Sequence, residues 1–233
     1  MITLRKSEER RHATNGGQET WRTFDGGNSS DPLQAGFRSL ESFNEERLAP
    51  GASFEYHPRR DMEILTYVRK GALIQEDPSG GTIALEVGEC RRSTARAGTL
   101  HRASNGSLTD PAQVFLCCIL PDREDSALLS DQRRFSLAER RGVLRLLLSP
   151  DGRNASLRLR RDAKMYSSLL ETGQHLIHEL VAGRGAWLHV VHGSIRLIDH
   201  RLNAGDAASL VDEAAVSLTA REPSEILLFD LGN

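Results

Sequence analysis

Short apolar segments separated by turns run along the whole chain. In the first half they cover residues 37–43, 52–56, 63–68, 72–75, 82–85, 90–94 and 114–120, and in the second half 156–159, 165–170, 174–180, 186–191, 194–198, 207–211, 215–219 and 226–231. Many short strands at close, regular spacing are typical of antiparallel β-sandwiches and barrels. We therefore expect an all-β protein.

The pattern is interrupted once, in the middle of the chain. Residues 122–141 are charged and lack strand alternation, and 126–140 could carry a short helix. We predict a first domain over 1–121, a linker over 122–141 and a second domain over 142–233. The polar residues 1–38 are expected to add one or two strands around the first domain, with a loop near 25–32.

The two halves form a weak internal repeat. Residues 187–195 resemble 64–73, and residues 202–207 resemble 85–90, so that Gly71 matches Gly193 and Gly88 matches Gly205. No histidine in the second half stands at the position of His101. Both halves are therefore expected to share a scaffold, with candidate ligands in the first half alone.

Composition narrows the class of protein. The 233 residues are 39% hydrophobic and 27% charged, with a formal net charge of −2. These values are ordinary for a globular protein and argue against a general nucleic-acid binder or a binder of anionic membranes. The N-terminus has no signal-peptide pattern, and the longest apolar run, 114–120, is too short to span a bilayer. We expect a cytoplasmic protein.

The three cysteines have no metal-ligand spacing. Cys117 and Cys118 lie in an apolar run and should point to opposite faces of a strand. We interpret them as core residues. The alternative, a redox-responsive thiol, requires a low pKa and exposure.

Two spaced motifs carry the candidate chemistry. His57, Arg59, Asp61 and Glu63 alternate along the first motif, and His101 and Ala103 alternate in the second. Side chains two residues apart share one face of a strand, so residues 57, 59, 61 and 63 are expected to lean to one face, and residues 101 and 103 to share a face of a later strand. A small antiparallel barrel can bring these two faces together into one pocket.

These motifs resemble the pirin family of the cupin superfamily, and the segment from Asp31-Pro32 through Ala49-Pro50-Gly51 is similar to it as well. The resemblance implies a bicupin: two antiparallel β-barrels of the jelly-roll, double-stranded β-helix type, joined by a short linker. It also implies an iron-like metal held by His-Pro-His-Arg and His-Ser-Glu motifs, and quercetin 2,3-dioxygenase activity. His57 and His101 match these motifs. Arg59 replaces the second histidine, and Ala103 replaces the glutamate.

These two replacements decide the expected cofactor. Two unit charges about 4 Å apart repel by roughly 4 kcal/mol at an effective dielectric near 20, so Arg59 should oppose a divalent ion. Arg59 could instead pair with Glu63 or Asp61 and fill the pocket, which we therefore expect to be metal-free. If Arg59 turns to solvent, His57, His101 and Glu63 could still hold iron or another divalent transition metal. A third hypothesis is that Arg59 and Arg60 make the pocket a binding site for an anion or carboxylate, because guanidinium groups bind planar anions through paired N–H groups.

The expected function follows from the expected cofactor. We predict a metal-free binding or regulatory protein whose partner is a small molecule or another protein, with monomer and dimer both compatible with the sequence. The alternative is a metal-dependent oxygenase of the quercetin 2,3-dioxygenase type. A further cluster near the second motif is interpreted as a solvated rim, with a positively charged pocket mouth as its alternative: Arg91, Arg92, Arg96 and Arg102.

Overall fold

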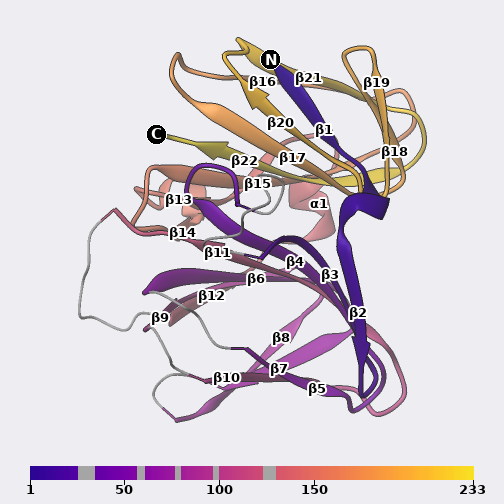
Figure 1. Cartoon of the computed structure of the whole chain (residues 1–233), viewed down its shortest axis with the longest axis vertical. Helices are drawn as coiled ribbons and strands as arrows, with labels where there is room; N and C mark the ends of the chain where they lie inside the picture. Colours follow the sequence, from indigo (N-terminus) through magenta and orange to yellow (C-terminus); the bar gives the residue numbers. More distant parts are fainter. Residues whose placement is uncertain (26–34, 57–60, 77–79, 97–99, 123–129) are drawn as a thin grey trace.

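The protein, seen in a computed structural model, is built from four stacked β-sheets (Figure 1). The structure describes residues 1–25, 35–56, 61–76, 80–96, 100–122 and 130–233. Two seven-stranded sheets face each other in the middle, and a four-stranded sheet covers the outer face of each. The all-β, jelly-roll bicupin architecture is thereby confirmed.

The first half contains one large and one small sheet. The large sheet has the order β12-β9-β6-β11-β4-β3-β2 and the small sheet β5-β10-β7-β8. Their strands are β2 (Arg11–Asn15), β3 (Gln18–Asp25), β4 (Leu40–Leu48), β5 (Ser53–Tyr56), β6 (Met62–Lys70), β7 (Ala72–Glu76), β8 (Thr82–Glu86), β9 (Glu89–Ala95), β10 (His101–Asn105), β11 (Ala112–Ile119) and β12 (Ser130–Arg134).

The second half repeats this arrangement. Its large sheet has the order β1-β20-β17-β22-β15-β13-β14, and its small sheet β16-β21-β18-β19. The strands are β1 (Ile2–Arg5), β13 (Arg145–Ser149), β14 (Leu157–Arg158), β15 (Ala163–Leu170), β16 (His175–Glu179), β17 (Gly185–His192), β18 (Ser194–Leu197), β19 (His200–Asn203), β20 (Ala207–Val211), β21 (Ala215–Ala220) and β22 (Ser224–Leu231). The described helices are η1 (Ser7–Glu9), α1 (Leu137–Arg140) and η3 (Arg153–Ala155), and none is long and apolar enough to cross a membrane.

The turn glycines support the internal repeat. Gly71 follows β6 with φ +75°, and Gly193 follows the equivalent β17 with φ +77°. A Cβ at these positions would approach the carbonyl oxygens of Pro111 and Pro223 to 2.7 and 2.4 Å. Both turns therefore need a residue that tolerates positive φ and close backbone contact.

Apolar side chains form three clusters. One lies inside each half, between its large and its small sheet. The third lies between the two large sheets, where Leu65 and Phe115 of the first half join Trp187 and Phe229 of the second. Because fully burying such a side chain contributes about 1.5–3 kcal/mol, the contact between the halves is a large part of the stability of the fold.

The chain departs from the predicted domain limits at two places. β1 pairs with β20 in the second large sheet, with Ile2 opposite Leu210, before the chain returns to the first half (Figure 1). β12, inside the predicted linker, pairs with β9 of the first large sheet, and only α1 matches the helix expected there. β1 and β12 each occupy an edge of their sheet, where they satisfy the backbone groups of the strand beside them.

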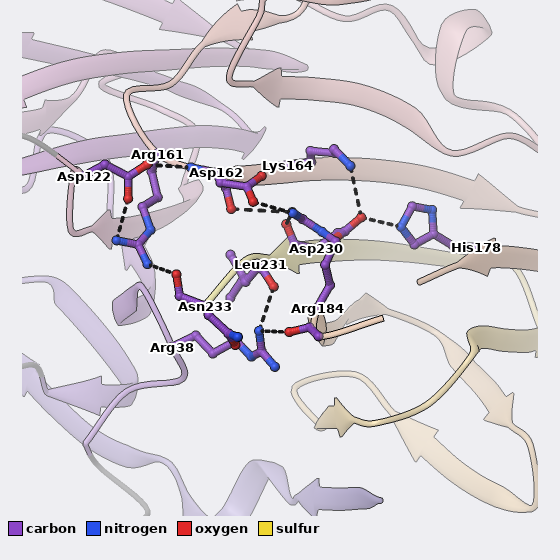
Figure 2. A network of polar contacts seen from close by, with 11 residues as sticks. Arg38, Asp122, Arg161, Asp162, Lys164, His178, Arg184, Asp230, Leu231 and Asn233 are labelled. Carbon is purple, nitrogen blue, oxygen red and sulfur yellow. Dashed lines mark hydrogen bonds and ion pairs between the residues drawn. The ribbon is translucent and has the colours of Figure 1, made fainter. Parts of the chain in front are cut away.

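A hydrogen-bonded segment before β4 also joins the halves. Arg38 donates from Nη1 to the carbonyl oxygens of Gly183, at 2.8 Å, and of Leu231, at 3.1 Å. Figure 2 shows this contact beside a polar network around Asp230, to which Arg184, Lys164 and His178 contribute. The Arg38 contacts join the two halves at this rim, whereas Asp230 faces the small sheet of the second half, on the same side of β22 as Leu228.

Candidate functional site

β10 contributes side chains to the interior of the first half, and burial alternates along this strand. His101 and Ala103 are buried, at 6% and 3% exposure, while Arg102 between them is exposed. Ala103 packs in the apolar cluster of the first half, so His101 faces the same interior. The prediction that residues 101 and 103 share an inward face is confirmed.

Neighbouring strands complete this interior around His101. β10 pairs with β5, which places His101 opposite Tyr56 and Ala103 opposite Phe54. The rings of His101 and Tyr56 stack with centroids 5.1 Å apart. Burial and the nearby Cys118 raise the pKa of Tyr56, so its hydroxyl stays protonated at neutral pH.

A buried polar chain crosses the same interior. Gln75, opposite Ala103 on β7, donates from Nε2 to Thr66 Oγ1 at 3.0 Å. Arg91 donates from Nη1 to Gln75 Oε1 at 3.2 Å, and its Nε and Nη2 donate to Ser130 Oγ at 3.1 and 2.9 Å. The chain places a positive charge and several hydrogen-bonding groups inside the first half.

Glu63 lies on the other side of its sheet, facing the second half. It shares a face of β6 with Leu65 and Tyr67, which pack in the cluster between the halves. Its Oε2 accepts a hydrogen bond from the backbone N–H of Arg160 at 2.8 Å, and its Oε1 lies 3.8 Å from Arg92 Nη1. We expected Glu63 and His101 to face the same pocket. This prediction is wrong, because the two side chains lie on opposite sides of the large sheet.

The error comes from assuming one continuous strand. β5 ends at Tyr56 and β6 begins at Met62 in a different sheet, so alternation cannot be counted across residues 57–61. His57 and Arg59 themselves lie outside the described residues. Asp61, expected to line the pocket, is exposed just before β6.

The arginine cluster of the second motif divides between surface and interior. Arg102 is half-exposed and pairs with Glu55 at 2.6 Å, as expected for a solvated rim. Arg91 and Arg92 are each only 2% exposed, which corrects the rim interpretation for these two residues. They alternate on β9, so Arg91 enters the interior of the first half and Arg92 the boundary, where it pairs with Asp131 at 2.7 Å.

Comparisons with known proteins show the family to which the chain belongs. Residues 5–117 match a family model described as Pirin, and residues 146–231 match one described as Quercetinase C-terminal cupin domain. The chain is 35% identical over 231 residues to a quercetin 2,3-dioxygenase of Escherichia coli strain K12, covering 99% of both chains. The chain belongs to the pirin family. A "Pirin-like protein" of Caulobacter vibrioides is 30% identical over 201 residues, with 86% of each chain covered.

Solved structures of similar proteins share the whole fold. The crystal structure of the bacterial pirin YhhW in complex with nickel(II), from Escherichia coli, superposes with a TM-score of 0.88 at 33% identity, covering 100% of this chain and 99% of that one. The structure of YhaK from Escherichia coli gives a TM-score of 0.75 at 27% identity, over 92% and 94% of the two chains. The bicupin resemblance read from the motifs is confirmed along the full chain.

The described residues account for only part of the metal centre that the family resemblance implies, since His57 lies outside them. Within them, no three His, Cys, Asp or Glu side chains gather closely enough to hold a metal ion. His101 supplies one nitrogen ligand, Ala103 offers none, and Glu63 faces away. An oxygenase-type iron centre needs at least three protein ligands on one side of the metal.

The cysteines have the properties of core residues. Cys117 packs in the cluster between the halves, and Cys118, on the opposite face of β11, is partly buried near Tyr56. Burial raises the pKa of Cys118 to about 11 and that of Cys90 to about 12, and it raises the pKa of Cys117 as well. Reactive cysteines have low pKa values, so this arrangement favours the core interpretation.

Several interior residues were not identified from the sequence. Tyr56 lies opposite His101 and Gln75 lies opposite Ala103 in strand pairs that only the register of the small sheet defines, and Thr66 of the large sheet bonds to Gln75. Gln75 carried a usable signal, because it is a polar residue at the end of the apolar segment 72–75. Its partner could not be inferred from that segment alone.

Proposed function

We propose that this pirin is a metal-free binding protein whose ligand site is the interior of the first half. The position of Glu63 carries the proposal. Its carboxylate interacts with the Arg160 N–H and with Arg92 between the halves. It therefore does not substitute for the motif glutamate that Ala103 replaces. A ligand set reduced in this way favours an organic ligand over a catalytic metal.

The interior residues indicate the chemistry of that ligand. Arg91, Gln75 and Thr66 place hydrogen-bonding groups beside the stacked rings of His101 and Tyr56. Phe54 and Ala103 add apolar surface. Sites that combine aromatic walls with a few polar groups suit small planar molecules that carry oxygen substituents. A regulatory role would follow if binding altered contacts with a partner protein.

One comparison favours a second candidate, a metal-dependent oxygenase. Relatives that cover the whole chain carry the name quercetin 2,3-dioxygenase, and the E. coli pirin YhhW has been solved with nickel(II). In this chain such a centre would combine His101 with His57 and at least one further ligand. Neither Glu63 nor Ala103 supports that ligand set.

Metal content separates the two candidates. We would measure bound metals by plasma mass spectrometry on tag-free protein, before and after incubation with ferrous, nickel, copper, manganese and zinc ions. The E. coli pirin YhhW, prepared in parallel, is the positive control. We expect substoichiometric metal under every condition and no turnover of quercetin.

Three variants sharpen this measurement. His57→Ala and His101→Ala remove the two candidate ligands, and His200→Ala removes an exposed histidine of the second half as a matched control. Near-stoichiometric metal that is lost in the first two variants and kept in the third would overturn the proposal. It would make the oxygenase the primary function.

A further inference from the structure

A cavity of about 160 Å³ opens at the boundary between the halves, away from the interior that contains His101. Its walls come from β1, β3, the segment before β4, β17 and β20, so both halves contribute. β1 and β20, which lie side by side in the large sheet of the second half (Figure 1), both contribute to this lining. An apolar cavity of about 150 Å³ accommodates a benzene molecule, so this one has room for a single aromatic ring.

Three aromatic side chains line the cavity. The Trp187 ring lies 4.7 Å from Phe24 and 6.0 Å from Phe37, measured between centroids, with both pairs tilted. Phe24 and Trp187 are almost fully buried, at 4% exposure each. Flat, rigid apolar walls favour a planar ligand, because ring-to-ring contact adds to the burial of surface.

Two buried N–H donors belong to the same lining. Trp187 Nε1 and Arg5 Nε have no hydrogen-bond partner among the residues that the structure describes. Arg5 is 5% exposed, and its Nη2 contacts the carbonyl oxygens of Thr23 and Glu9 at 3.3 and 3.4 Å. A buried donor without a partner is costly, and each such group in a native structure calls for an explanation.

The charge of Arg5 gives the strongest indication that the ligand of this cavity is an anion. Within the described part of the chain, Arg5 makes no ion pair with a carboxylate, whereas the buried Arg10, Arg92 and Arg140 each pair with one. A buried guanidinium beside an aromatic cavity is a site for a planar anion, which it binds through paired N–H groups.

We infer that this cavity binds a small aromatic carboxylate of one ring. The ring would lie against Phe24, Phe37 and Trp187, and the carboxylate would accept hydrogen bonds from Arg5 and from the indole N–H of Trp187. Because both halves line the cavity, the bound ligand would hold them together. This site is independent of the function proposed for the interior of the first half.

The two tryptophans of the chain provide a direct assay. In a ¹H–¹⁵N correlation spectrum each indole gives one Nε1–H resonance, and Trp21→Phe assigns them. Trp21 stacks on His12 and lies under Arg47, and it does not line the cavity, so it serves as an internal control. Titration with benzoate should shift the Trp187 resonance saturably and leave that of Trp21 in place. Benzyl alcohol, which lacks the charge, should bind about tenfold more weakly or worse.

Variants test the recognition groups separately. Ser209→Leu fills the cavity from β20 without removing either donor, and it should abolish the benzoate-dependent shift. Ser53→Leu, at an exposed serine of β5, is the matched control and should bind as the native protein does. Arg5→Gln should weaken benzoate by about tenfold and leave benzyl alcohol unchanged. If Arg5→Gln does not fold, the Ser209→Leu result still decides the site.

The outcomes that would overturn the inference are distinct. No saturable shift of the Trp187 resonance would mean that benzoate does not bind in this cavity. An equal response in Ser209→Leu would place benzoate elsewhere on the protein. Equal affinity for benzoate and benzyl alcohol would show that Arg5 does not recognise the carboxylate. The inference that the ligand is a carboxylate would then be wrong.

Discussion

The side chain of Glu63 accepts a hydrogen bond from the backbone N–H of Arg160, 97 residues further along the chain, at 2.8 Å. Glu63 is fully buried, and this bond joins the central sheet of the first half to the second half. The carboxylate that was the candidate third metal ligand therefore has a structural partner in the second half. The consequence for stability can be measured without knowing the ligand.

Glu63→Ala should lower the free energy of unfolding by about 2–4 kcal/mol, because it leaves the Arg160 N–H unpaired and opens a cavity. Glu63→Gln keeps an acceptor oxygen and should cost about 1 kcal/mol. Urea unfolding followed by circular dichroism measures both changes. Glu55→Gln, at an exposed residue paired with Arg102, is the control and should change stability by no more than about 0.5 kcal/mol. Equal losses in Glu63→Ala and Glu55→Gln would contradict the assignment.

The same residue predicts a pH dependence. Burial raises the pKa of Glu63 above its ordinary value of 4.5, against the opposing effects of the Arg160 N–H and the Arg92 charge. The folded protein therefore binds this proton more tightly than the unfolded chain does. The contribution of Glu63 to stability is complete below pH 4.5 and falls as the pH rises through its folded pKa. The stability of the native protein relative to Glu63→Gln should decline over that window, and unfolding curves at stepped pH would show it.

Restoring the two family ligands should create metal affinity. Ala103→Glu alone places a carboxylate in the apolar interior and should destabilise the protein by about 2–4 kcal/mol. In Arg59→His with Ala103→Glu, nickel should raise the melting temperature, because the metal binds only the folded state. Adding His101→Ala to the double variant is the control and should remove this effect. A native protein that nickel stabilises as strongly would contradict the prediction.

The cysteines should be unreactive in the folded protein. Burial raises the pKa of Cys118 to about 11, so the nucleophilic thiolate is scarce at neutral pH. Ellman's reagent at pH 7 should modify the native protein slowly, and all three thiols should react after denaturation. The native rate should keep rising with pH up to the limit of folded stability. A thiol that reacts rapidly at pH 7, and is lost in Cys118→Ser, would establish the redox alternative.

The polar network around Asp230 should give the fold sensitivity to acid (Figure 2). Burial by itself raises the pKa of Asp230, but hydrogen bonds from His178 and Arg184, with the charges of Arg184 and Lys164, hold it at about 2. This contribution to stability is present above the ordinary pKa of 3.8 and is lost as the pH falls through the folded value.

Asp230→Asn should therefore lower the free energy of unfolding at pH 7 by about 2 kcal/mol, and the difference from the native protein should shrink between about pH 4 and pH 2. Chemical unfolding at a series of pH values measures both. Asp122→Asn, at a half-exposed carboxylate that pairs with Arg161, should cost no more than about 0.5 kcal/mol. A difference that stays constant with pH would contradict the role of ionised Asp230.

Local sequence patterns determined the fold class, the repeat and part of the site. Strand alternation placed His101 and Ala103 on one inward face, and the glycines Gly71 and Gly193 marked equivalent turns. These features depend on side-chain periodicity and on backbone sterics, which act over a few residues. They can therefore be read without knowledge of the neighbouring strands.

Tertiary structure alone decided which groups meet. Glu63 faces the second half because β6 belongs to a different sheet from β5, and Arg91 enters the interior because β9 pairs with β6 in the register that the sheet imposes. Trp187 and Arg5 line one cavity because β1 crosses to the second sheet. Such meetings depend on strand pairing and on the packing of layers between residues far apart in the chain, and no local pattern encodes them.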